Sequence, residues 1–87
     1  MSASIVLFSL SSCPKCGDVK TLLQERGVSF TFHNLDWMAG EERNETMRAL
    51  KKVNPEITFP TLVVGDEVVV GAKMEKIEEV LATHENG

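Results

Sequence analysis

The 87-residue sequence is poor in aromatic residues, has no tyrosine and contains only two cysteines. Two cysteines cannot build the multi-bridge framework that stabilises small secreted domains. Long hydrophobic runs are missing too, because the run from Ile5 to Phe8 is far too short for a signal-peptide core or a membrane span. We therefore expect a cytoplasmic protein without a membrane partner, in a compartment where disulfides are more often catalytic than structural.

An excess of basic residues is missing as well. Nine lysines and arginines stand against thirteen acidic residues, which gives a net charge of −4. Nucleic-acid-binding domains usually carry a basic stripe, so we expect no nucleic-acid partner. Apolar residues at 43% and charged residues at 25% are typical of a folded globular chain, and the length favours a single domain over residues 1–87.

Hydrophobic periodicity predicts seven elements in the order β-α-β-α-β-β-α. Pro14 suits the first position of the first helix, and Gly27 supplies its end. A right-handed crossover makes the first two strands parallel, and a turn at Gly65-Asp66 makes the last two antiparallel. We therefore predict an α/β fold with a four-stranded mixed sheet and three helices. The expected strands cover residues 5–8, 28–33, 61–64 and 68–70, and the expected helices cover residues 14–26, 41–53 and 73–83.

The two cysteines, Cys13 and Cys16, follow directly on the first predicted strand and are separated by Pro14 and Lys15. The helix that begins here directs unpaired N–H groups toward Cys13, and Lys15 adds a positive charge, so both favour a thiolate at Cys13. Residues i and i+3 of a helix lie about 5–6 Å apart at Cβ, close enough for a disulfide after a small adjustment. We interpret Cys13 as the attacking thiolate and Cys16 as the resolving thiol.

Three other interpretations of the cysteine pair stay open. One is a metal or iron–sulfur site, for which His33, His84 and carboxylates are the further ligands that the chain offers. A second is an inert pair of buried thiols, and a third is a non-catalytic interaction domain. A pair placed between a strand and a helix in a βαβ unit favours the redox interpretation, so we expect no resident metal and no bound cofactor.

With these motifs the chain resembles the glutaredoxin family of the thioredoxin superfamily. The resemblance covers nearly the whole chain and rests on Cys13-Pro14-Lys15-Cys16, on Thr58-Phe59-Pro60, and on Gly65 and Gly71 around the last hairpin. It implies a thioredoxin fold and a dithiol–disulfide oxidoreductase that reduces protein disulfides or mixed disulfides of small thiols. It also implies a cis peptide bond before Pro60, which leaves the backbone of Phe59 free to pair with an extended thiol peptide.

Departures from the family pattern concern the binding of glutathione. Leu10 stands where glutathione-using members usually carry a lysine, and Glu56-Ile57 stand where glutamine or arginine is common. The segment from Gly71 to Met74 replaces a Gly-Gly-x-Asp motif, although the backbone N–H groups of Lys73 and Met74 and the charge of Lys73 suit a carboxylate. The resemblance thus implies a substrate-binding surface made of Pro14, Lys15, Thr58, Phe59, Pro60, Lys73 and Met74.

The missing cations leave two reductants open. One is glutathione or another small thiol, used as a co-substrate. The alternative is a redoxin that thioredoxin reductase recharges, of the type that donates electrons to ribonucleotide reductase. The expected partners are therefore a disulfide-containing protein or small thiol substrate, together with one of these two reductants.

Residues outside the motifs carry simpler expectations. His33 falls on the polar side of its strand and is expected to be solvated. Lys20 is expected to be an exposed helix charge that adds positive potential near the cysteines. Trp37 follows the second strand and is expected in the core or at its rim.

Overall fold

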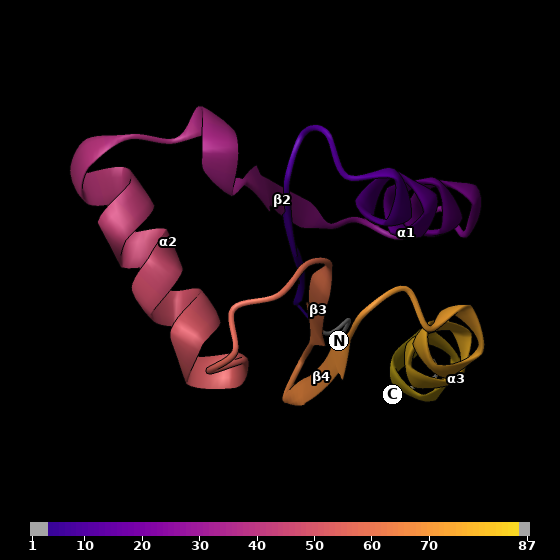
Figure 1. The fold of residues 1–87 in the computed structure, drawn as a ribbon. Coiled ribbons are helices and arrows are strands. Elements are labelled where there is room, and N and C mark those ends of the chain that lie inside the picture. Colours follow the sequence, from indigo (N-terminus) through magenta and orange to yellow (C-terminus); the bar gives the residue numbers. More distant parts are fainter. Residues whose placement is uncertain (1–3, 86–87) are drawn as a thin grey trace.

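The computed structural model describes residues 4–85, which form a four-stranded mixed sheet with helices on both faces (Figure 1). The strands are β1 (Ile5–Ser9), β2 (Thr31–Asn34), β3 (Thr61–Val64) and β4 (Glu67–Val70), and they lie in the order β2-β1-β3-β4. The helices are α1 (Pro14–Glu25), the short 3₁₀ helix η1 (Leu35–Trp37), α2 (Gly40–Val53) and α3 (Met74–Glu85). Strands β1 and β2 are parallel, whereas β3 is antiparallel to both β1 and β4. The predicted α/β fold is confirmed.

Helices α1 and α3 cover one face of the sheet, and α2 covers the other (Figure 1). Successive residues of β1 serve the two faces in turn, because side chains alternate along a strand. Leu7 packs in the cluster with α1 and α3, whereas Phe8 packs with Leu35 and Leu50 on the α2 face. Since both faces are covered, β1 is a continuous apolar run without alternation.

The local sequence explains where α1 begins and ends. Cys13 is the N-cap residue in extended conformation, and Pro14 occupies the first helical position, where a missing N–H costs nothing. The helix ends at Glu25, one residue before the predicted end, and Gly27 follows with φ +70°. Glycine suits this left-handed conformation, which other residues rarely adopt.

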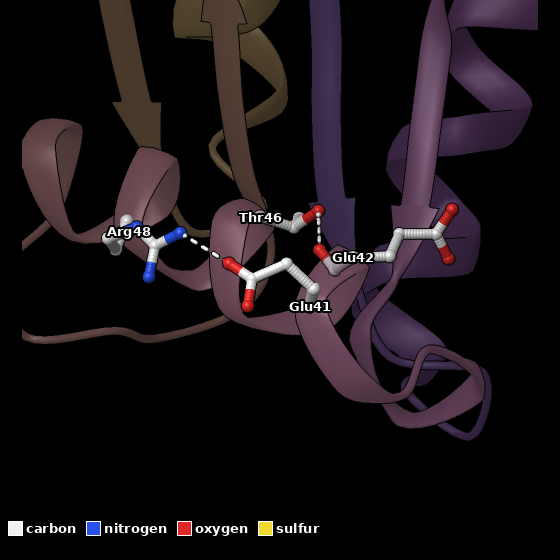
Figure 2. A network of polar contacts seen from close by, with 4 residues as sticks. All are labelled: Glu41, Glu42, Thr46 and Arg48. Atoms are coloured by element: carbon white, nitrogen blue, oxygen red, sulfur yellow. Dashed lines mark hydrogen bonds and ion pairs between the residues drawn. The ribbon is translucent and has the colours of Figure 1, made fainter.

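Helix α2 carries a polar network on its exposed first turns (Figure 2). The Arg48 guanidinium donates to Glu41 Oε1 over 3.0 Å, and the Thr46 hydroxyl donates to the Glu42 carbonyl oxygen over 2.9 Å. Exposed ion pairs of this kind contribute only about 0–1 kcal/mol. The helix is therefore held mainly by its apolar side, where Leu50 is completely buried.

Strand β2 is shorter than the alternating pattern predicts. A strand was expected over residues 28–33, but only Thr31–Asn34 pairs with β1. Val28 and Phe30 pack against the core from the connection before the strand, so their alternation reflects burial without strand pairing. The expectation of a solvated His33 is wrong, because this side chain is half-buried. It lies on the same side of the sheet as Phe8, and the centroids of the two rings are 5.8 Å apart.

Helix α3 extends beyond its predicted end at residue 83. It runs from Met74 to Glu85, so His84 is helical although it lies beyond the predicted helix, and its Nε2 lies 3.5 Å from Glu67 Oε2. Residues 86 and 87 lie outside the described residues. Across residues 4–85 none of the helices combines the length and the apolar character that a membrane span requires.

Candidate functional site

The candidate site lies at the edge of the sheet where the parallel strands β1 and β2 end. The chain that leaves β1 turns to the face of α1, whereas the chain that leaves β2 passes through η1 to the face of α2 (Figure 1). In open α/β sheets a crevice forms where the connections of neighbouring strands separate in this way. Cys13 lies at this point, as the residue that caps α1.

The two cysteines are free thiols with different environments. Cys13 is half-buried, whereas Cys16 is 3% exposed. The backbone N–H of Cys16 donates to Cys13 Sγ over 3.2 Å, so a donor of the helix N-terminus is directed at this sulfur. Burial, and next the hydrogen bond with Cys13, raise the pKa of Cys16 to about 11. Cys16 therefore keeps its proton at neutral pH, and the pair is asymmetric.

The loop before Cys13 is attached to η1 by Asp36. The backbone N–H of Ser11 donates to Asp36 Oδ1 over 2.9 Å, and the Ser11 hydroxyl donates to Oδ2. The hydroxyl bond, followed by the backbone bond, lowers the pKa of the Asp36 carboxyl below its ordinary value. The Ser9 hydroxyl donates to Asn34 Oδ1 over 2.6 Å and joins the ends of β1 and β2. The backbone that presents Cys13 is therefore fixed from the side of β2, which the sequence pattern did not indicate.

A second loop, residues 54–60, leads into β3 at the same edge of the sheet; we call it the Pro60 loop. The register of β1 and β3 pairs Phe8 with Thr61, so Pro60 lies beside the end of β1. The Phe59–Pro60 peptide bond is cis, as the family resemblance implies. The Pro60 carbonyl oxygen accepts a hydrogen bond of 2.8 Å from the backbone N–H of Gly71, which places the segment before α3 next to this loop.

Asn54 holds the Pro60 loop in place. Its Nδ2 donates to the hydroxyl oxygens of Thr58 and Thr61, both over 3.0 Å, and its Oδ1 accepts from the Glu56 N–H over 3.2 Å. Asn54 and Thr61 are buried, so these hydrogen bonds take the place of water. Between them Ile57 has φ +53°, which is rare for a β-branched residue. In the sequence Asn54 only follows a helix that is predicted to end at residue 53, and no local pattern there indicates this network.

A hollow of about 210 Å³ opens beside the cysteines on the α1 face of the sheet. The expectation of an exposed Lys20 is wrong, because Lys20 is half-buried and its Nζ lies 3.7 Å from the centroid of the Phe32 ring. Trp37 is 74% exposed, so it belongs to the rim and not to the core. The residues that line the hollow include Cys13, Cys16, Gly17, Lys20, Asn34 and Trp37.

The other predicted binding residues differ in their surroundings. Lys15 and Thr58 are exposed, whereas Phe59 is half-buried and packs against the core cluster on the α2 face. Lys73 and Met74 line a different hollow, of about 430 Å³, along the first turns of α3, and it shares no lining residue with the hollow at Cys13. The link between Gly71 and Pro60 is the contact that connects this segment to the Pro60 loop.

This arrangement is suited to thiol exchange. A half-buried sulfur at a helix N-terminus lies three residues from a buried thiol that keeps its proton. Over residues 4–85 no three His, Cys, Asp or Glu side chains gather closely enough to hold a metal ion. The metal interpretation of the cysteine pair stays open for a metal that two chains share.

Comparisons with known proteins cover both loops of the site. A family model described as Glutaredoxin matches residues 5–69. Glutaredoxin-C11 of Arabidopsis thaliana is 35% identical over 83 residues, which is 94% of this chain and 74% of that protein. The crystal structure of methanoredoxin of Methanosarcina acetivorans has a TM-score of 0.87 at 32% identity, over 92% of this chain and 85% of that one. A buckwheat glutaredoxin–glutathione complex has a TM-score of 0.72 at 25% identity, over 94% of this chain and 76% of that one.

Proposed function

Because this chain belongs to the glutaredoxin family, we propose that it is a dithiol–disulfide oxidoreductase in which Cys13 attacks and Cys16 resolves. Family membership supports a role in thiol–disulfide exchange in general. The assignment of the two roles is supported by the asymmetry of the pair. Cys13 is the more accessible sulfur and accepts an N–H hydrogen bond, whereas Cys16 is buried and keeps its proton.

The proposed cycle consists of two thiol–disulfide exchange steps. In the first, the Cys13 thiolate attacks a substrate disulfide; the substrate S–S bond breaks, a Cys13–substrate disulfide forms, and the other substrate sulfur leaves as a thiolate that takes up a proton. In the second, Cys16 loses its proton to solvent and attacks Cys13 Sγ. The Cys13–Cys16 disulfide forms, and the second substrate sulfur leaves and is protonated. The substrate gains two electrons, which the protein dithiol loses.

The proposed substrates are protein disulfides or mixed disulfides of small thiols. Glutathione is the reductant that the family favours, and one structural relative is a glutathione complex. A second candidate is thioredoxin reductase, which is favoured by Leu10 and Glu56 at positions where glutathione-using members carry other residues. A reduction assay supplied with each reductant alone separates the two candidates. Rapid recycling by glutathione alone contradicts the second.

The test of the proposed function compares Cys13→Ser with Cys16→Ser. We expect Cys13→Ser to reduce no disulfide faster than the uncatalysed exchange, because Cys16 is buried and keeps its proton. Cys16→Ser is expected to trap a mixed disulfide with a protein substrate, which intact mass spectrometry detects, while retaining activity on small single-thiol adducts. A Cys13→Ser protein that reduces disulfides at the wild-type rate contradicts the proposal.

A further inference from the structure

The hollow beside Cys13 is lined by a glycine, Gly17, that the fold does not require. Gly17 lies inside α1, where glycine is less stable than alanine by about 0.5–1 kcal/mol. Its backbone is helical, and an added Cβ would meet no atom within 4 Å. Neither turn geometry nor packing therefore explains this residue. Glycine is common where a ligand comes close to the backbone, and Gly17 lines the hollow.

The same hollow contains a positive charge that is held in a fixed place. Lys20 lies one helical turn beyond Cys16, and its ammonium rests on the face of Phe32 in β2. The ion pairs found within residues 4–85 leave Lys20 without a carboxylate partner. Asp36, near the rim, is already bonded to Ser11, and Asp18 lies on the opposite side of α1 at 100° per residue. The charge of Lys20 is therefore available to an acidic group that enters the hollow.

The distance from Cys13 to Lys20 indicates which residue of a peptide substrate would carry this acidic group. The two Cα atoms are seven residues apart on a helix, or about 10 Å, and a helical side chain leans back toward the N-terminus. An extended peptide advances about 3.3 Å per residue. A peptide whose cysteine reacts at Cys13 thus brings a side chain two or three residues away to Lys20, with the exposed ring of Trp37 beside it.

We propose that this hollow is a specificity subsite for protein substrates, in which Lys20 pairs with an Asp or Glu two or three residues from the reactive cysteine. The subsite lies between α1 and the ends of β1 and β2, where the connections of the two strands separate. This inference rests on the proposed function, because it concerns the substrate that Cys13 attacks. Lys20 is a specificity-determining residue and takes no part in the exchange itself.

The test measures single-turnover reduction of peptide disulfides by the pre-reduced protein. The peptides are identical except for Glu or Gln at one position, which is two or three residues before or after the reactive cysteine. A small uncharged disulfide serves as the reference substrate. The variants are Lys20→Gln and, as a control with the same loss of charge, Lys52→Gln on the exposed side of α2.

We expect the wild type and Lys52→Gln to prefer one Glu peptide over its Gln partner by about two- to fivefold, which corresponds to one exposed ion pair. The ratio should fall to about one in Lys20→Gln, and in the wild type at high salt. A merely structural role of Lys20 would change both rates together and leave the ratio intact. A wild-type ratio of one, or an unchanged ratio in Lys20→Gln, overturns the inference.

A second variant tests the space in the hollow. Gly17→Ala should raise the melting temperature or leave it unchanged, because alanine favours the helix. It should nevertheless slow the reaction with the peptides several-fold more than the reaction with the reference disulfide. Peptide reduction at the wild-type rate by Gly17→Ala overturns the proposed location. Failure of the wild type to reduce even the reference disulfide refutes the proposed function, and the inference with it.

Discussion

The substitution Asn54→Ala removes the side chain that shapes the Pro60 loop. Asn54 makes hydrogen bonds of 3.0 Å to the hydroxyls of Thr58 and Thr61 and accepts one of 3.2 Å from Glu56 N–H. A typical hydrogen bond contributes about 0.5–1.5 kcal/mol net. The bonds to Thr58 and Glu56 are discounted because both residues are exposed and can turn to water, whereas Thr61 is completely buried. We therefore expect the free energy of unfolding to fall by about 2–3 kcal/mol.

Thermal and urea unfolding measure this loss. For a chain of this size, 1 kcal/mol corresponds to about 4–8 °C, so the melting temperature should fall by about 8–24 °C. The matched control is Asn44→Ala, which changes an exposed asparagine of α2 and should leave stability unchanged or slightly raised. Disulfide reduction should also slow at 20 °C, where the variant is still folded, because the Pro60 loop loses its support.

A double-mutant cycle isolates the bond between Asn54 and Thr61. Thr61→Val preserves the shape of the side chain and removes the hydroxyl, which also donates 2.7 Å to the Thr58 carbonyl oxygen. We expect a coupling energy of about 1 kcal/mol between Asn54→Ala and Thr61→Val. The reasoning is refuted if Asn54→Ala differs from Asn44→Ala by less than about 0.5 kcal/mol, since surface substitutions commonly lie within that range.

The remaining predictions concern the pH dependence of stability and the reactivity of the two thiols. The pKa of Cys16 is raised from its ordinary value of 9.0 to about 11. The stability that its protonated thiol contributes is therefore complete below pH 9 and is lost as the pH rises toward 11, by at most about 1.4 kcal/mol per pH unit. Urea midpoints of the wild type and Cys16→Ala should converge over this window; curves that stay parallel contradict the raised pKa. Because the pKa of Asp36 is lowered below 3.8, its stabilisation is present above that pH and is lost as the pH falls through the lowered value. The stability difference between the wild type and Asp36→Asn should therefore shrink at low pH, and a difference that grows there counts against the Ser11–Asp36 contact. Native-state alkylation at neutral pH should modify Cys13 and spare Cys16, and equal labelling contradicts the asymmetry of the pair.

Strand and helix order was predictable because local signals agreed with one another. The apolar run before Cys13, Pro14 at the start of α1 and Gly27 after its end each act within a few residues. The boundaries of β2 were not predictable, because Val28 and Phe30 pack against the core cluster between the sheet and helices α1 and α3, while only Thr31–Asn34 pairs with the neighbouring strand. Burial and strand pairing produce the same alternating pattern.

The sequence by itself determined the chemistry that the chain offers: two cysteines at i and i+3, a proline that starts the helix between them, and the Thr58-Phe59-Pro60 motif. These features depend on residue type and short spacing, and a linear pattern records both. Tertiary structure alone decided which residues surround the cysteines. Asp36 lies 25 residues from Ser11 in the chain, yet it holds the loop before Cys13. Lys20 meets Phe32 across the gap between a helix and a strand. Such contacts depend on the register in which the strands pair and on the face of the sheet that each connection crosses. No local pattern contains that information.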